Sequence, residues 1–136
     1  MPARRNASWC IAVVGALLVL LGIAHNWFGL PSLQRAVARG DVASRMAEPQ
    51  LINWAFSGGA MSVLGLVCLL QLGELRRGSP AAWRVILLIG GFLLVVGVGA
   101  YLRTANAGVL VFAGLGSLIV IPLLLWAREF RGSPPG

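Results

Sequence analysis

Five polar side chains in this 136-residue chain have the types and spacing to form a binding site within an otherwise apolar sequence. His25 supplies an imidazole, which titrates near neutral pH and can donate or accept a hydrogen bond. The amides and the hydroxyl add further donors and acceptors, and glycines near His25 leave open space beside it. We therefore predict that a ligand would be held by these residues: His25, Asn26, Asn53, Ser57 and Asn106.

The same residues also have a purely structural interpretation. An amide or hydroxyl left without a partner in an apolar medium is costly, so such groups must find hydrogen bonds within the protein. A cluster that closes the helix ends at an interface would satisfy them without any ligand. We favour this interpretation, and the ligand pocket remains the alternative.

The chain has few residues that could bind a metal ion or act in catalysis. Zinc sites use three or four N, S or O ligands, whereas the chain has one histidine, two separated cysteines and no acidic residue within its apolar stretches. A nucleophilic Ser57 would require a base and an orienting acid arranged beside it. We expect no catalytic residue, no metal and no cofactor, and a protein that is not an enzyme.

Four apolar stretches are the elements that would position the polar residues. Uncharged windows lie between these pairs: Arg5 and Arg35, Glu48 and Glu74, Arg84 and Arg103, and Arg103 and Arg128. Each is long enough for a membrane span of roughly 20 residues, the third with help from Arg84 extending toward the headgroups. We predict an all-α fold, a four-transmembrane-helix antiparallel bundle forming one integral membrane domain over residues 1–136. The predicted helices cover residues 9–30, 51–72, 82–102 and 107–126.

Composition and tryptophan placement agree with this fold. The chain is 58% hydrophobic and 11% charged, with a mean hydropathy of +0.85, whereas soluble proteins have about 25% charged residues. Indole prefers the headgroup level of a membrane. All five tryptophans fall within about a turn of a predicted helix end: Trp9, Trp27, Trp54, Trp83 and Trp126.

The antiparallel order of the first two helices brings four of the candidate site residues to one depth. His25 and Asn26 close the first helix, while Asn53 and Ser57 open the second. All four should therefore lie near the outer surface, and Asn106 approaches the same level from the second hairpin.

Arginine distribution predicts the orientation in the membrane, because short basic segments remain cytoplasmic. Seven arginines fall on one side of the predicted bundle: Arg4, Arg5, Arg76, Arg77, Arg84, Arg128 and Arg131. Four fall on the other: Arg35, Arg39, Arg45 and Arg103. Both termini are predicted to be cytoplasmic. The net charge of +7 is spread over loops on both faces, so we expect anionic lipids, and no nucleic acid, as partners.

The connection over residues 31–50 has room for structure. Ser32 could cap a short helix ended by Gly40, and Asp41 could cap a second that stops before Pro49. An irregular loop is the alternative. The first apolar stretch could also be a signal peptide, but its apolar pattern continues through Trp27 and Phe28, so we expect an uncleaved helix.

Small residues recur on single helix faces, which favours close helix packing in lipid. The pairs stand four or seven residues apart: Ala12 and Ala16, Gly15 and Gly22, Gly58 and Ser62, Gly90 and Gly97, and Ala113 and Ser117. These faces could serve the bundle itself, a homo-oligomer or a larger membrane complex.

The stretch Gly22-Ile-Ala-His25-Asn-Trp-Phe-Gly29 resembles a G-x-x-H-x-x-x-G pattern in small bacterial four-helix membrane proteins of unknown function. The resemblance implies a topology and a candidate histidine, but no reaction. We expect a bacterial inner-membrane protein that acts noncatalytically, as an accessory or lipid-interacting bundle. The alternative is a transporter or membrane enzyme with a small-molecule cavity near the outer leaflet beside His25.

Overall fold

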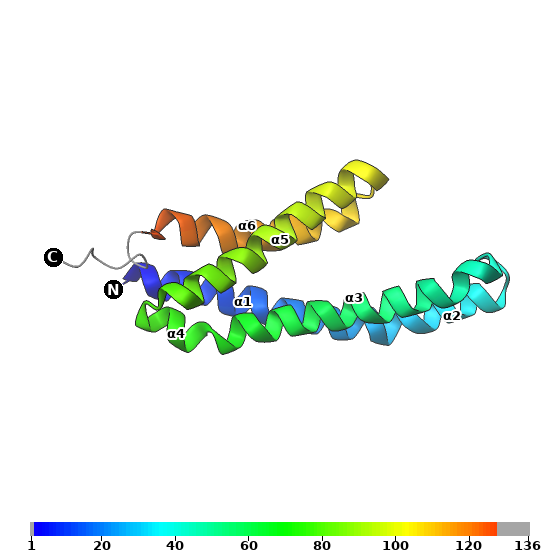
Figure 1. The fold of residues 1–136 in the computed structure, drawn as a ribbon, viewed down its shortest axis with the longest axis horizontal. Coiled ribbons are helices and arrows are strands. Elements are labelled where there is room, and N and C mark those ends of the chain that lie inside the picture. Colours follow the sequence, from blue (N-terminus) through cyan, green and yellow to red (C-terminus); the bar gives the residue numbers. More distant parts are fainter. Residues whose placement is uncertain (1, 128–136) are drawn as a thin grey trace. The chain divides into compact units, whose positions relative to one another are not determined.

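The structure is a computed structural model that describes residues 2–127, and it is all-helical over that range (Figure 1). The α-helices are α1 (Pro2–Ala24), α2 (Leu30–Ala38), α3 (Ser44–Leu70), α4 (Leu72–Arg77), α5 (Pro80–Thr104) and α6 (Leu110–Leu125). A π-helix, η1 (His25–Gly29), joins α1 to α2, and a 3-10 turn, η2 (Ala107–Val109), precedes α6. The predicted all-α fold is confirmed.

Within the described residues, four helical stretches are long and apolar enough to cross a membrane: Arg5–Ala38, Ser44–Arg77, Pro80–Thr104 and Ala107–Leu125. The second pair agrees with the predicted ranges to within a few residues. The first pair is longer, because the helical path continues well past the predicted limits of residues 30 and 51. Arg128 and Arg131, which contribute to the predicted orientation, lie outside the described residues.

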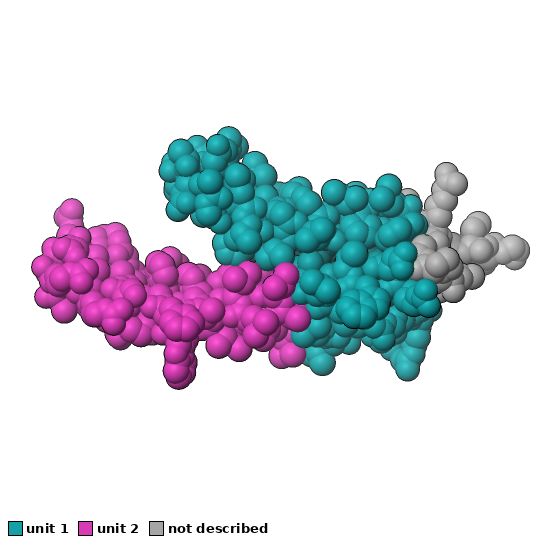
Figure 2. All heavy atoms as spheres, turned by 180° about the vertical axis from the view of Figure 1, so that it is seen from behind, with its two compact units in different colours: residues 1–14, 68–136 teal, residues 15–67 magenta. Residues whose placement is uncertain are grey.

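The chain divides into two compact units (Figure 2). The hairpin unit comprises residues 15–67, and the terminal unit comprises residues 1–14 with 68–136. The expectation of one integral membrane domain stays a prediction.

Glycine allows the two arms of the hairpin unit to approach at backbone distance. A side chain on Gly65 would place its Cβ 2.5 Å from the Gly15 carbonyl oxygen and 2.8 Å from the Val19 nitrogen. Nearer the tip, Gly22 has no room for a side chain against the Gly58 carbonyl and Ser62. Such contacts bring Cα hydrogens toward carbonyl oxygens, a recurring feature of closely packed membrane helices. The predicted small-residue faces that contain Gly15, Gly22 and Gly58 are therefore used within the chain, whereas Ala16 is exposed.

The tip of the hairpin unit corrects part of the predicted connection. Gly40 does end α2, with a φ of 79° and a hydrogen bond from its nitrogen to the Val37 carbonyl. The predicted caps are wrong: Ser32 lies inside α2 and donates to the Phe28 carbonyl, while Asp41 pairs with Arg39. Pro49 does not stop a helix: it lies inside α3, five residues after the helix begins at Ser44, and removes one backbone hydrogen bond without ending the helix.

The terminal unit is built around the α5–α6 hairpin. Gly90 faces Ile119, and a Cβ on Gly116 would lie 2.6 Å from the Gly90 carbonyl oxygen, so these helices also meet at backbone distance. Trp83 adds an interhelical hydrogen bond from Nε1 to the Leu123 carbonyl, 3.1 Å long. The fully buried side chains of this unit come from α1, α3, α4, α5 and α6, and they include Ile11, Cys68, Leu75, Ile86, Ile119 and Leu123.

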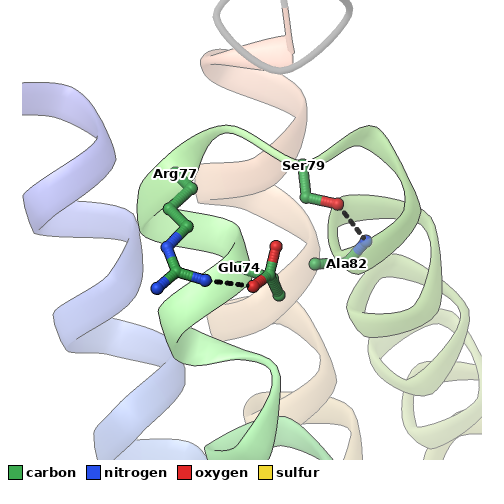
Figure 3. Close-up of polar contacts among 4 residues, drawn as sticks. All are labelled: Glu74, Arg77, Ser79 and Ala82. Atoms are coloured by element: carbon green, nitrogen blue, oxygen red, sulfur yellow. Dashed lines mark hydrogen bonds and ion pairs between the residues drawn. The ribbon is translucent and has the colours of Figure 1, made fainter.

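The turn between α4 and α5 follows its sequence closely (Figure 3). Gly78 takes a left-handed φ of 84°, and the Ser79 hydroxyl accepts a hydrogen bond from the Ala82 nitrogen at the start of α5. Glu74 and Arg77 form an ion pair on the exposed surface of α4. Pro80 then occupies the first turn of α5, where its missing N–H has no helical partner to lose.

Candidate functional site

The π-helix at the end of α1 presents His25 and Asn26 to the opposite arm of the hairpin unit. Isolated π-turns often occur at functional positions because they change the hydrogen-bonding register of a helix. Here the indole N–H of Trp54 on α3 donates to the His25 carbonyl, over 3.1 Å. Gly29, at the other end of the π-turn, lies against the same indole, 2.5 Å from Nε1 to where a Cβ would stand. Trp54 therefore contacts both ends of the π-turn.

His25 is held by stacking and by one hydrogen bond. Its ring lies 4.4 Å from the Trp54 ring, with an angle of 10° between the two planes. Its Nε2 atom is 3.0 Å from the Ser57 hydroxyl oxygen, and that oxygen is 2.8 Å from the Trp54 carbonyl. The Trp54 carbonyl can only accept, so the single hydroxyl hydrogen of Ser57 points to it. His25 Nε2 must then carry the hydrogen that Ser57 accepts.

We expect neutral His25 to be the Nε2–H tautomer, with the lone pair on Nδ1. Nitrogen-15 NMR of labelled full-length protein in detergent separates protonated from unprotonated ring nitrogens. Replacing Ser57 with alanine should convert the single tautomer into a mixture and cost about 1 kcal/mol of stability. Ser62→Ala is the matched control, since Ser62 bonds the Gly58 carbonyl and does not bond the imidazole. A protonated Nδ1 in the unmodified protein would contradict this hydrogen-bond arrangement.

Asn26 is anchored on one side and pressed against glycine on the other. Its Nδ2 donates to the Ala55 carbonyl over 3.1 Å. Its Oδ1 is buried and has no hydrogen-bond partner among the described residues. That oxygen faces the Cα hydrogen that stands in place of a side chain on Gly58. A Cα–H···O contact is weak, so it compensates only part of the lost hydration.

The structure brings together three of the five predicted site residues. His25, Asn26 and Ser57 meet between η1 and α3. Asn53 is exposed on α3, where it borders a shallow groove of about 490 Å³ with Glu48, Pro49, Ile52 and Phe56.

Asn106 belongs to the terminal unit, where its Oδ1 accepts from the Gly108 nitrogen at 2.9 Å and shapes the α5–α6 turn. A part in ligand binding stays a prediction for all five residues.

Trp54 is the central residue that sequence reasoning missed. The sequence places it at a predicted helix end, where an indole is expected for its preference for headgroups. Its position three residues before Ser57, on the same face of a helix, was the available signal. In the structure it stacks on His25, donates to the His25 carbonyl and accepts from Ser57 through its own carbonyl.

The chemistry available to this cluster is mainly structural. Within residues 2–127, no three His, Cys, Asp or Glu residues gather closely enough to hold a metal ion. Among the described residues, the hydrogen bonds of His25 and Ser57 run to each other and to the indole N–H and the carbonyl of Trp54, with no carboxylate among them. Comparison with protein-family models, with curated proteins and with solved structures found no match.

Proposed function

We propose that the chain is an integral membrane protein that acts noncatalytically, as a small accessory or lipid-interacting helical bundle of a bacterial inner membrane. The observation that supports this is the outward surface of the helices. Large apolar side chains on three spanning stretches are at least 70% exposed: Phe56, Leu88, Val95, Leu102 and Leu125. Water tolerates such continuous apolar surface poorly, whereas lipid chains cover it at no cost.

The cluster beside η1 supports a noncatalytic role. Two of its hydrogen bonds run from a side chain on one arm of the hairpin unit to the backbone of the other, and a third joins the His25 and Ser57 side chains; polar contacts of this kind stabilise helix pairs in membranes. The His25 ring stacks on Trp54 and is hydrogen-bonded to Ser57, so these contacts already give it a structural role. We infer that the cluster stabilises the packing of η1 against α3.

The proposed orientation places both termini in the cytoplasm. Within the terminal unit, the start of α1, α4, the start of α5 and the end of α6 gather at one end (Figure 1, Figure 3). These segments include Arg5, Arg76, Arg77 and Arg84. A concentration of arginine at one end of the spans supports a cytoplasmic position for that end.

Membrane fractionation and topology reporters test the proposal. The full-length protein should remain in the membrane pellet after alkaline carbonate washing and should enter solution only with detergent. A reporter that is active only outside the cytoplasm should be inactive when fused after Gly136 and active when inserted after Gly40. A folded monomer in buffer without detergent would overturn the membrane location, and an active reporter at Gly136 would overturn the orientation.

One observation favours a second candidate function, a transporter or membrane enzyme with a small-molecule cavity beside His25. The Oδ1 atom of Asn26 is buried without a hydrogen-bond partner among the described residues, and a ligand that brings a donor would satisfy it. Mass spectrometry of protein purified in mild detergent separates the two functions. A small polar molecule that is retained by the native protein and lost from Asn26→Ala would favour the second.

A further inference from the structure

An apolar groove lies in the terminal unit between residues 9–14 of α1 and the middle of α6. Its volume is about 250 Å³, and it is lined by Trp9, Cys10, Val13, Val14 and Leu118. At about 30 Å³ for each water molecule, this volume equals roughly eight waters. A methylene group is of similar size, so the groove can hold part of one extended acyl chain.

Two polar groups stand on the same face of α1, toward its N-terminus. Arg5 is four residues before Trp9, so the two side chains are neighbours on the helix surface, about 6 Å apart along the axis. Arg5 is exposed and forms no ion pair with the described residues, and the indole N–H of Trp9 meets no acceptor among them. Along this face of α1, the Arg5 guanidinium comes first, the Trp9 indole N–H second and the apolar groove third. Neither polar group has a partner among the described residues.

This order of groups matches the cross-section of one phospholipid leaflet. A phosphate carries negative charge at the surface, ester oxygens lie just below it, and acyl chains follow. Because side chains on a helix tilt toward its N-terminus, the Trp9 indole leans toward the level of Arg5. The groove itself supplies position and little affinity, since an acyl chain is equally apolar in bulk lipid. Selectivity must come from the guanidinium and the indole N–H.

We propose that this groove binds an anionic glycerophospholipid, with its phosphate at Arg5 and Trp9 and one acyl chain beside Val13 and Leu118. The proposal rests on the membrane location proposed above. The groove on α3 provides a contrast, because it is bordered by the carboxylate of Glu48 and would repel the same headgroup.

Native mass spectrometry of the full-length protein in detergent tests the site. The probes are dioleoylphosphatidylglycerol and dioleoylphosphatidylcholine, which differ in headgroup and share their acyl chains. One arginine near a membrane surface favours an anionic lipid about fivefold. Arg5→Gln should therefore weaken binding of the glycerol lipid about fivefold and weaken binding of the choline lipid less, because the choline cation offsets the negative charge of its phosphate. Arg103→Gln removes the same charge at the end of α5 and should have no such effect.

Filling the groove provides a second, independent variant. Val13→Trp should reduce binding of both lipids at this site, because Val13 lines the groove while remaining accessible at its surface. Val95→Trp adds the same bulk to an exposed position of α5 and serves as the control.

The outcomes separate the lipid site from the proposed function. Equal lipid binding by Arg5→Gln, Arg103→Gln and the unmodified protein would overturn the site while leaving the membrane location standing. Protein that is folded and soluble without detergent would overturn the membrane location itself. A stable dimer that Val13→Trp dissociates, with no dependence on added lipid, would assign the groove to a second copy of the chain and overturn the lipid site.

Discussion

Gly65→Leu is expected to destabilise the hairpin unit by about 3 kcal/mol. A Cβ at this position would lie 2.5 Å from the Gly15 carbonyl oxygen, 2.8 Å from the Val19 nitrogen and 2.9 Å from the Leu18 Cβ. Two of these atoms belong to the backbone of α1, so no side-chain rotation can relieve the overlap. The arms must separate, and the interhelical contacts on both sides of Gly65 weaken together.

Gly59→Leu is the matched control on the same helix. A Cβ on Gly59 would meet no heavy atom within 4 Å, so leucine there should change stability by less than about 1 kcal/mol. Unfolding by heat or by sodium dodecyl sulfate, followed in the same detergent for both variants, gives the comparison. If the two variants lose equal stability, the close approach of α1 and α3 is not what holds the hairpin unit together.

The spans could be predicted from the sequence because hydrophobic length is a strong and local signal. An uncharged window long enough to cross a membrane needs no tertiary information to be recognised. Turn chemistry was equally local at Gly78, Ser79 and Pro80, where each residue meets a standard requirement of helix ends.

The structure of residues 31–50 was harder to predict from the sequence, because the tertiary structure overrides the local preferences of several of these residues. Ser32 is a good helix cap in isolation, but α2 already begins at Leu30, directly after the π-turn, so its hydroxyl bonds back to the Phe28 carbonyl instead. Proline often ends or kinks a helix, yet α3 continues through Pro49, which removes one backbone hydrogen bond. Neither outcome can be read from the residues alone.

The depth of the candidate site residues along the spans could be predicted from the sequence. The side of the helix on which each side chain lies could not. The antiparallel order of α1 and α3 was enough to bring His25 and Ser57 to the same level. Asn53 reaches that level too, but it lies about 100° around α3 from Trp54 and is exposed. The π-turn also rotates Asn26 relative to a regular helix, and nothing in the residue types announces a π-turn. The contact between Asn26 and Gly58 therefore required the structure.

Trp54 is expected to contribute more to stability than any other side chain of the cluster beside η1. Trp54→Ala should lower the free energy of unfolding by about 3 kcal/mol. The change removes the ring that stacks on His25, the donor to the His25 carbonyl and the surface against which Gly29 packs. Trp54→Phe separates these contributions, because a phenyl ring keeps the stacking and loses only the N–H. Leaving a carbonyl without its partner should cost roughly 1 kcal/mol.

Trp27→Ala supplies the control, since Trp27 belongs to the same π-turn but is 75% exposed. Its loss should barely change the midpoint of thermal unfolding in detergent. Trp54→Phe should lower that midpoint, and Trp54→Ala should lower it further. If Trp54→Phe is as damaging as Trp54→Ala, stacking contributes little and the indole hydrogen bond alone holds the π-turn. If both variants match Trp27→Ala, the cluster does not stabilise the fold, and the ligand interpretation of His25 and Asn26 becomes the stronger one.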